Sequence, residues 1–183
     1  MLIDNKHKFK KISTLGLMGL MASTQLFTVP YFYIDAYANM KSNFELRKKV
    51  ISVTGIMSLN QDMNKNISRA EFALMAVRAS KYKNMLTKSS NVALYSDVDR
   101  NSEYASAIKV ASEQGWMSGY LGGKFMPEKE ISLQEAVKAL LYMLGYKAEN
   151  FAGDQLNKRM ALYSNLGLGE FVLKGANDSI SRA

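Results

Sequence analysis

The side chains that could carry out a reaction are few, because the chain contains no cysteine and its only histidine is His7. His7 lies in an N-terminal segment that we expect to be removed, so the mature chain would have neither thiolates nor imidazoles. The plausible enzymatic designs are then a pair of carboxylates, as in a glycosidase, or a serine activated by a lysine. No carboxylate pair stands out, and four glutamates are most simply surface residues or helix caps: Glu103, Glu113, Glu128 and Glu130. We therefore predict a protein without catalytic residues or a cofactor.

One stretch of oxygen-bearing side chains has the length of a calcium-binding loop. Residues 60–71 resemble an EF-hand at positions 3, 5, 8, 9 and 12 of its loop. The first position is Asn60, however, and Lys65 stands where the sharp turn requires glycine. A second partial match starts at Asp97 and has Ile108 at its twelfth position. Calcium binding is therefore kept as the alternative function, and no metal-binding residue is predicted.

A short phrase occurs three times and indicates where helices begin. It is Ile-Ser-Arg-Ala-Glu at residues 67–71, Ile-Ser-Leu-Gln-Glu at 131–135 and Ile-Ser-Arg-Ala at 180–183. In the first two copies a glutamate follows the serine by three residues, which is the spacing of a capping box. The predicted helix-capping residues are Ser68, Glu71, Ser132 and Glu135.

Apolar residues after the first two phrases recur with the spacing of an amphipathic helix. They are Phe72, Met75, Ala76 and Ala79 in the first unit, and Val137, Leu140, Leu141 and Leu144 in the second. Another helix precedes each phrase and ends at a glycine: residues 46–54, 104–114 and 156–166. One such unit is too small to bury its apolar face, so we expect three units to pack around a shared core.

The N-terminal segment has the pattern of a secretory signal peptide. Four lysines within residues 6–11 precede an apolar stretch from Ile12 to Ile34, and residues 36–38 form an Ala-x-Ala cleavage site. An uncleaved membrane anchor is the alternative, because the segment is longer than usual and Pro30 interrupts it. We predict cleavage after Ala38, which leaves an exported protein with no stable membrane span.

The whole chain carries a net charge of +8, and about +6 remains once residues 1–38 are removed. Such a basic surface attracts polyanions. Outside a cell these are wall polymers and membrane headgroups, so we expect a wall polymer as the partner and no nucleic acid.

The middle unit resembles the S-layer homology domains of bacterial surface proteins, and the resemblance extends over nearly all of residues 42–183. The matching stretches, in the family's order and spacing, are Tyr95–Val98, Tyr104–Ile108, Gly115, Gly119–Tyr120, Gly123–Pro127 and Ile131–Ser132. The family usually has a Thr-Arg-Ala-Glu phrase at the second helix, so residues 68–71 match closely and Leu133 departs from the pattern. It also usually has tryptophan where Tyr104 stands.

The resemblance implies an all-α fold, a pseudo-threefold trefoil of helix-loop-helix repeats. Its grooves would bind secondary cell-wall polysaccharide, which often bears an acidic pyruvyl ketal. The predicted segments are a signal peptide at 1–38, a first repeat at 39–80, a linker or short irregular helix at 81–94, a second repeat at 95–148 and a partial third repeat at 149–183. The third unit stops at the first turn of its second helix, so we expect a fragment of a longer surface protein. A lattice protein, an adhesin or an enzyme could follow.

The family's chemistry suits arginines at helix starts, because a guanidinium there offers a planar set of donors to a carboxylate. Arg69 and Arg182 occupy such positions, whereas Leu133 cannot act in this way. We therefore predict that Arg69 and Arg182 bind the polysaccharide and that the groove depending on Leu133 is weak or structural.

Four further residues are predicted to bind the polysaccharide, each with a structural alternative. Tyr104 and Trp116 could stack on sugar rings or fill the core, since Tyr104 lies on the expected inward face. Asp97 could accept hydrogen bonds from sugar hydroxyls, or cap the helix that begins near residue 101, or stabilise the preceding turn. Lys124 contacts either an anion or solvent. The sequence leaves the oligomeric state open.

Overall fold

The structure is a computed structural model and describes residues 43–169 and 172–182. In these residues the regular elements are helices, and β-structure is limited to isolated bridges. The predicted all-α class is therefore confirmed. None of the helices in the described part of the chain is long and apolar enough to span a membrane. The predicted signal peptide, residues 1–38, lies outside the described residues.

The helices begin and end at the positions that the repeated phrases and the glycines indicate. Residues 43–53 are helical, and the helices that follow are α2 (Arg69–Arg78), α3 (Ala105–Glu113), α4 (Leu133–Met143) and α5 (Gln155–Asn165). Short 3-10 turns lie at η1 (Lys83–Met85) and η2 (Ala148–Phe151). Gly115 and Gly167, both with φ of 70°, follow the C-terminal caps of α3 and α5.

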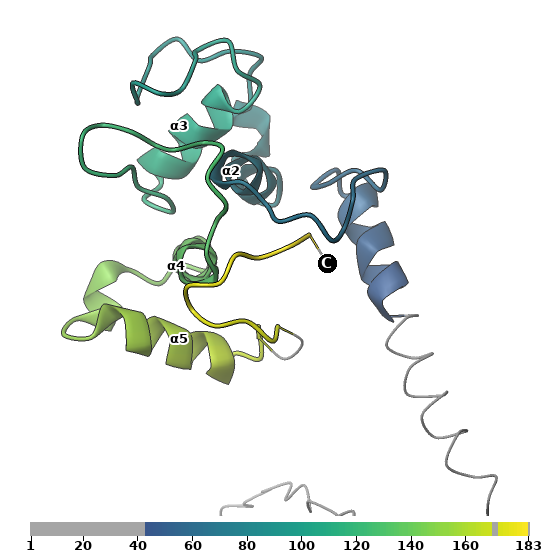
Figure 1. The fold of residues 1–183 in the computed structure, drawn as a ribbon, viewed down its shortest axis with the longest axis vertical. Coiled ribbons are helices and arrows are strands. Elements are labelled where there is room, and N and C mark those ends of the chain that lie inside the picture. The colour runs from purple at the N-terminus through teal and green to yellow at the C-terminus, as the bar shows by residue number, and fades with distance from the viewer. Residues whose placement is uncertain (1–42, 170–171, 183) are drawn as a thin grey trace, which may run out of the picture. The chain divides into compact units, whose positions relative to one another are not determined.

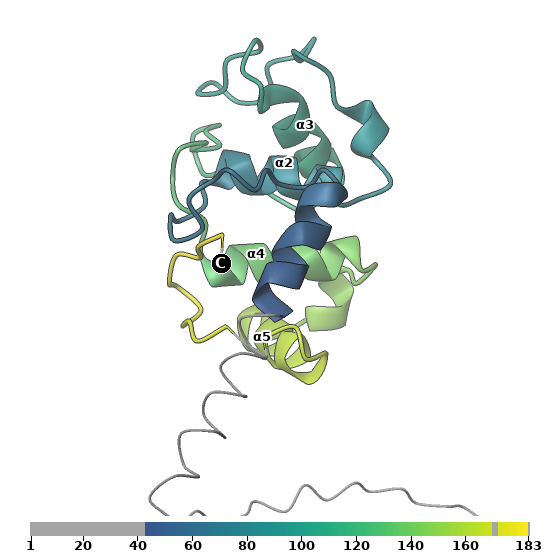
Figure 2. The same ribbon diagram turned by 90° about the vertical axis from the view of Figure 1, so that its right-hand side faces the viewer.

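The helices pack in two pairs, α2 with α3 and α4 with α5, and α4 lies between α2 and α5 in both views (Figure 1, Figure 2). Each pair joins the second helix of one unit to the first helix of the next. Because α4 lies in the middle, its buried residues extend beyond the predicted face to Leu133, Ala136 and Ala139. Leu140 and Leu144 were expected in the core but are 37% and 60% exposed.

The three phrases meet at a closed ring of backbone hydrogen bonds, which we call the central ring. The N–H of Ile67 donates to the carbonyl of Ile180, that of Ile131 to Ile67, and that of Ile180 to Ile131, at 2.9, 3.0 and 3.3 Å. In a second set of backbone hydrogen bonds, each donor lies two residues after the isoleucine of its phrase, and each acceptor lies two residues before the isoleucine of another phrase. The N–H of Arg69 donates to the carbonyl of Lys129, that of Leu133 to Asp178, and that of Arg182 to Lys65. Within each set the three bonds are equivalent and join the units in a cycle, so the predicted pseudo-threefold arrangement is confirmed.

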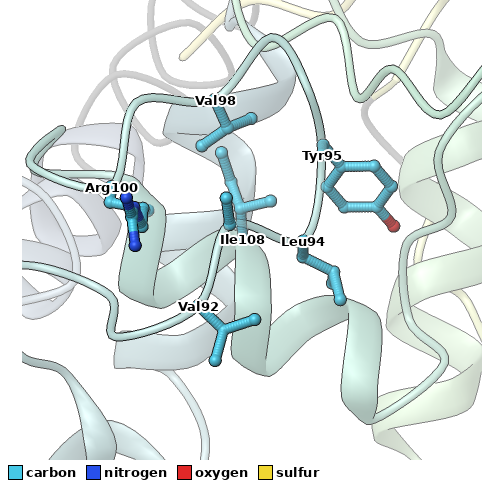
Figure 3. A pocket seen from close by; sticks show the side chains of 8 residues that line it. Val92, Leu94, Tyr95, Val98, Arg100 and Ile108 are labelled. Atoms are coloured by element: carbon cyan, nitrogen blue, oxygen red, sulfur yellow. The ribbon is translucent and has the colours of Figure 1, made fainter.

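Residues 81–94 fold against α3. The N–H of Thr87 donates to the hydroxyl of Ser106 on α3 at 3.0 Å, and the N–H of Ser90 donates to the carbonyl of Arg100 at 2.8 Å. The segment includes the 3-10 turn η1. A cavity of about 10 Å³ lies between residues 92–100 and Ile108 of α3 (Figure 3). It is barely large enough for one water molecule, so it is a packing gap that cannot hold a sugar.

Candidate functional site

Arg69 lies in the core between two units, and it is 2% exposed. Its Nε donates to the carbonyl of Phe125 at 2.9 Å, Nη2 to the carbonyl of Ser118 at 2.7 Å, and Nη1 to the carboxylate of Glu135. The guanidinium also lies over the rings of Phe125 and Tyr120. In the structure its donors are directed at acceptors of the protein and its side chain is shielded from solvent, and polysaccharide binding by Arg69 stays a prediction.

Arg182 makes the equivalent contact one unit further on. Its guanidinium donates to the carboxylate of Glu71 and, at 3.1 Å, to the carbonyl of Asp62, and its side chain is 5% exposed. The arginine of one phrase thus binds the glutamate of another, as Arg69 binds Glu135. Ligand binding by Arg182 likewise stays a prediction, and in the structure its guanidinium contacts these two acceptors of the protein. At the equivalent position of the second phrase, Leu133 packs into the core.

The two glutamates also cap their own helices. The N–H of Glu71 donates to the hydroxyl of Ser68 at 3.1 Å, and the N–H of Ser68 donates to the Glu71 carboxylate at 2.9 Å. The N–H and hydroxyl of Ser132 both donate to the Glu135 carboxylate. Both carboxylate oxygens of Glu71 therefore already have partners, which argues against Glu71 closing a calcium loop. The described residues contain no group of acidic or histidine side chains suited to a metal ion.

Asp97 fastens the glycine-rich loop of residues 119–127 to the segment before α3. Its Oδ1 accepts from the N–H of Phe125 and its Oδ2 from the N–H of Met126, both at 2.8 Å. Both oxygens therefore accept from backbone amides of the protein, which is a structural role, and the contact of Asp97 with sugar hydroxyls stays a prediction. Lys124, in the same loop, is exposed.

We predict that Asp97→Asn lowers the free energy of unfolding by about 1 kcal/mol, because it weakens two charge-assisted hydrogen bonds, one half-buried and one exposed. Burial opposes the ionisation of Asp97, but the amides of Phe125 and Met126 lower its pKa below the ordinary value. The stabilisation is thus present above the unfolded-state pKa and is lost as the pH falls through the lower folded-state pKa. Urea unfolding at neutral and at strongly acidic pH should show the difference from wild type narrowing in acid. The exposed Asp99→Asn is the control, and an equal small effect of both variants would contradict the prediction.

A groove of about 430 Å³ opens where α2, α3 and α4 end. Its aromatic side chains are Tyr82 after α2, Trp116 after α3, and Tyr142 and Tyr146 at the end of α4. Two lysines and a glutamine also line it: Lys81, Lys147 and Gln114. We call this the aromatic groove. Its volume and its mixture of aromatic and polar residues are typical of ligand sites.

Packing holds the rings of the aromatic groove in place. The rings of Tyr82 and Trp116 meet edge to face with centroids 5.7 Å apart, and Tyr146 leans on Phe151 at 6.3 Å. Trp116 is 5% exposed, so most of its indole fills the core while its remaining surface lines the groove. Rings held in this way offer flat apolar surfaces, and the tyrosines add hydroxyls, as sugar binding requires.

Sequence reasoning singled out Trp116 but missed the three tyrosines of the groove. A signal was available, because Tyr82, Trp116 and Tyr146 each follow the end of a helix by three or four residues. Only the packing of the helices shows that those ends come together.

The structure places Tyr104 apart from the aromatic groove. It is the N-cap residue of α3 and lines a separate cavity of about 160 Å³, together with Glu71, Glu128 and Glu130. Burial, followed by the charge of Glu103, raises the pKa of Tyr104. Its three carboxylates outnumber the one cation in its lining, Lys65, so this cavity favours an anionic ligand less than the aromatic groove does.

Comparison with known proteins agrees with the resemblance seen in the sequence. Residues 94–137, from the end of the 81–94 segment into α4, match the S-layer homology domain. The chain is 30% identical over 112 residues to the middle cell wall protein of Brevibacillus brevis, an alignment that covers 60% of this chain and 10% of that protein. It is 31% identical over 84 residues to the surface layer protein of Brevibacillus choshinensis, covering 46% and 8% respectively. The chain therefore spans about a tenth of the length of these curated relatives.

Proposed function

We propose that this chain, which carries an S-layer homology domain at residues 94–137, anchors its protein to the bacterial cell wall without catalysing a reaction. The ligand is an anionic secondary cell-wall polysaccharide bearing pyruvyl ketals, and the protein is exported to the cell surface. The names of the two relatives, a cell wall protein and a surface layer protein, support this location.

The observation that carries the proposal is the aromatic groove. Part of its wall, Gln114 to Trp116, belongs to the segment that matches the S-layer homology domain. Sugar rings stack on aromatic faces through their apolar hydrogens, and the groove provides several such faces with hydroxyls beside them.

Charge favours an acidic polymer over a neutral one. Lys81 and Lys147 line the groove, and the Nζ of Lys81 lies 5.2 Å from the centre of the Tyr82 ring. The whole chain is basic, which increases the local concentration of a wall polyanion around it.

We expect the protein to co-sediment with cell walls that carry the polysaccharide and to remain in solution with walls stripped of it. Tyr146→Ala should weaken this binding by roughly tenfold, because it removes one aromatic face from the groove. The matched control is Tyr104→Ala, which removes another half-buried tyrosine, outside the groove. Circular dichroism would confirm that both variants are folded.

Two results would contradict the proposal. Equal binding of the wild type to intact and stripped walls would reduce the interaction to general charge attraction. A loss of binding with Tyr104→Ala but not with Tyr146→Ala would move the site to the acidic cavity beside α3.

A further inference from the structure

The α4–α5 pair carries two cations at positions where the α2–α3 pair has apolar residues. Leu74 on α2 and Lys138 on α4 are equivalent, because each lies seven residues after the isoleucine of its phrase. On the partner helices, Ala107 of α3 and Arg159 of α5 are also equivalent, because each lies eight residues before the glycine that follows its helix. The α2–α3 pair forms with no charge at either position, and Ala107 is fully buried there. Packing of the fold therefore does not require Lys138 or Arg159.

Lys138 lies beside the aromatic groove. Its Nζ donates to the hydroxyl of Ser118 at 3.1 Å and lies 5.6 Å from the centre of the Tyr142 ring. Tyr142 lines the groove, and Ser118 follows Trp116 by two residues. Ser118 is exposed, so its hydroxyl is accessible to an anion from solvent.

The cations at this point have little compensation from the protein. Burial, then the like charges of Arg159 and Arg69, lower the pKa of Lys138. Glu135 acts in the opposite direction, but its carboxylate already accepts from Arg69 and from the hydroxyl of Tyr120 at 2.7 Å. The Nε of Arg159 is buried and has no hydrogen-bond partner among the described residues.

This arrangement costs stability, because desolvated like charges destabilise the folded state. An anionic ligand would supply the missing counter-charge and the missing hydrogen-bond acceptor. Features that cost stability without serving packing are often functional.

We propose that Ser118, Lys138 and Arg159 form an anion site that binds a carboxylate of the wall polymer, next to the aromatic groove. This inference rests on the proposed function. The guanidinium and the ammonium supply positive charge and donors, and the Ser118 hydroxyl accepts from Lys138 while its own hydrogen remains free to donate. A sugar ring stacked in the aromatic groove would thus place its acidic substituent at the anion site.

The test uses a double variant, Lys138→Leu with Arg159→Ala, which installs the residues of the α2–α3 pair at both positions. Isothermal titration calorimetry compares purified wall polysaccharide with the same polymer after its carboxyl groups are reduced to alcohols. The double variant should bind the intact polymer roughly ten- to a hundredfold more weakly than the wild type. Both proteins should bind the reduced polymer equally. The thermal midpoint of the double variant should equal or exceed that of the wild type, which shows that it is folded.

The outcomes separate the anion site from the proposed function. If the wild type and the double variant bind the intact polymer equally, the anion site is overturned and wall anchoring still holds. If the wild type binds neither polymer, the proposed function fails, and NMR titration of the Lys138 ammonium with pyruvate tests the site directly. A shift that Arg159→Ala abolishes supports the anion site, and no shift overturns it. An equal shift with inorganic phosphate overturns the assignment to a carboxylate.

Discussion

Arg69→Leu should lower the free energy of unfolding by about 3–5 kcal/mol, one of the two largest effects we expect. The guanidinium is 2% exposed and supplies hydrogen bonds to two carbonyls and one carboxylate from other parts of the chain. Leucine would leave the carbonyls of Phe125 and Ser118 without this donor and Glu135 without its counter-charge. The fold accommodates leucine at the equivalent position of the second phrase, Leu133, so we expect the variant to be destabilised but still able to fold.

Equilibrium urea unfolding, followed by circular dichroism, measures this effect. Arg100→Leu, at an exposed arginine, is the control and should change the stability by no more than about 0.5 kcal/mol. A double-mutant cycle with Glu135→Gln isolates the pair, and we expect the double variant to lose clearly less than the sum of the single losses. Strictly additive losses would show that Arg69 and Glu135 do not depend on each other.

The loss of Arg69 should also affect the proposed ligand sites. Ser118, whose carbonyl accepts from Arg69, is also the residue whose hydroxyl accepts from Lys138. Arg69 is therefore a positioning residue, and its replacement should weaken polymer binding even under conditions where the protein remains folded.

Phe125→Ala should have an effect of similar size, about 3–5 kcal/mol. The ring is fully buried, packs on Tyr95 with centroids 5.3 Å apart and lies beneath the Arg69 guanidinium at 4.6 Å. Its backbone binds Arg69 through the carbonyl and Asp97 through the amide. A cavity at this position would therefore loosen both the core and the attachment of residues 119–127.

The matched control lies four residues earlier, in the same loop. Leu121 is fully exposed, so Leu121→Ala should change the unfolding free energy by no more than about 0.5 kcal/mol. Phe125→Leu, which keeps more of the buried volume, should fall between the two. If thermal and urea unfolding gave similar small effects for all three variants, residues 119–127 would not be part of the cooperative core.

Much of the fold could be predicted from the sequence because its signals are local. A capping box needs a serine and a glutamate three residues apart, and Ser68 with Glu71 meet that requirement without help from the rest of the chain. The glycines that follow α3 and α5 are local signals too, because glycine adopts the positive φ at the end of a helix without strain. The all-α class, the three-unit pattern and the resemblance to S-layer homology domains follow from these features.

The site depended on contacts between residues far apart in the chain. Arg69 was correctly placed at a helix start, but the direction of its side chain was decided by Glu135, 66 residues away, and by the carbonyl of Phe125. In the same way the hydrogen bonds of Asp97 go to amides of residues 125 and 126, which lie 28 and 29 residues away in the chain. A local pattern specifies where a side chain starts, but only its neighbours in space determine whether it faces the core or a ligand.

The sequence by itself therefore determined the helices, their order and the kind of protein to which this chain is similar. Only the tertiary structure decided that helices pair across unit boundaries, that three helix ends form an aromatic groove, and that α4 with Lys138 packs against α5 with Arg159. Helix starts and stops follow from hydrogen bonds within a few residues of each other. Grooves and charge clusters arise where segments distant in the sequence bury their apolar faces together.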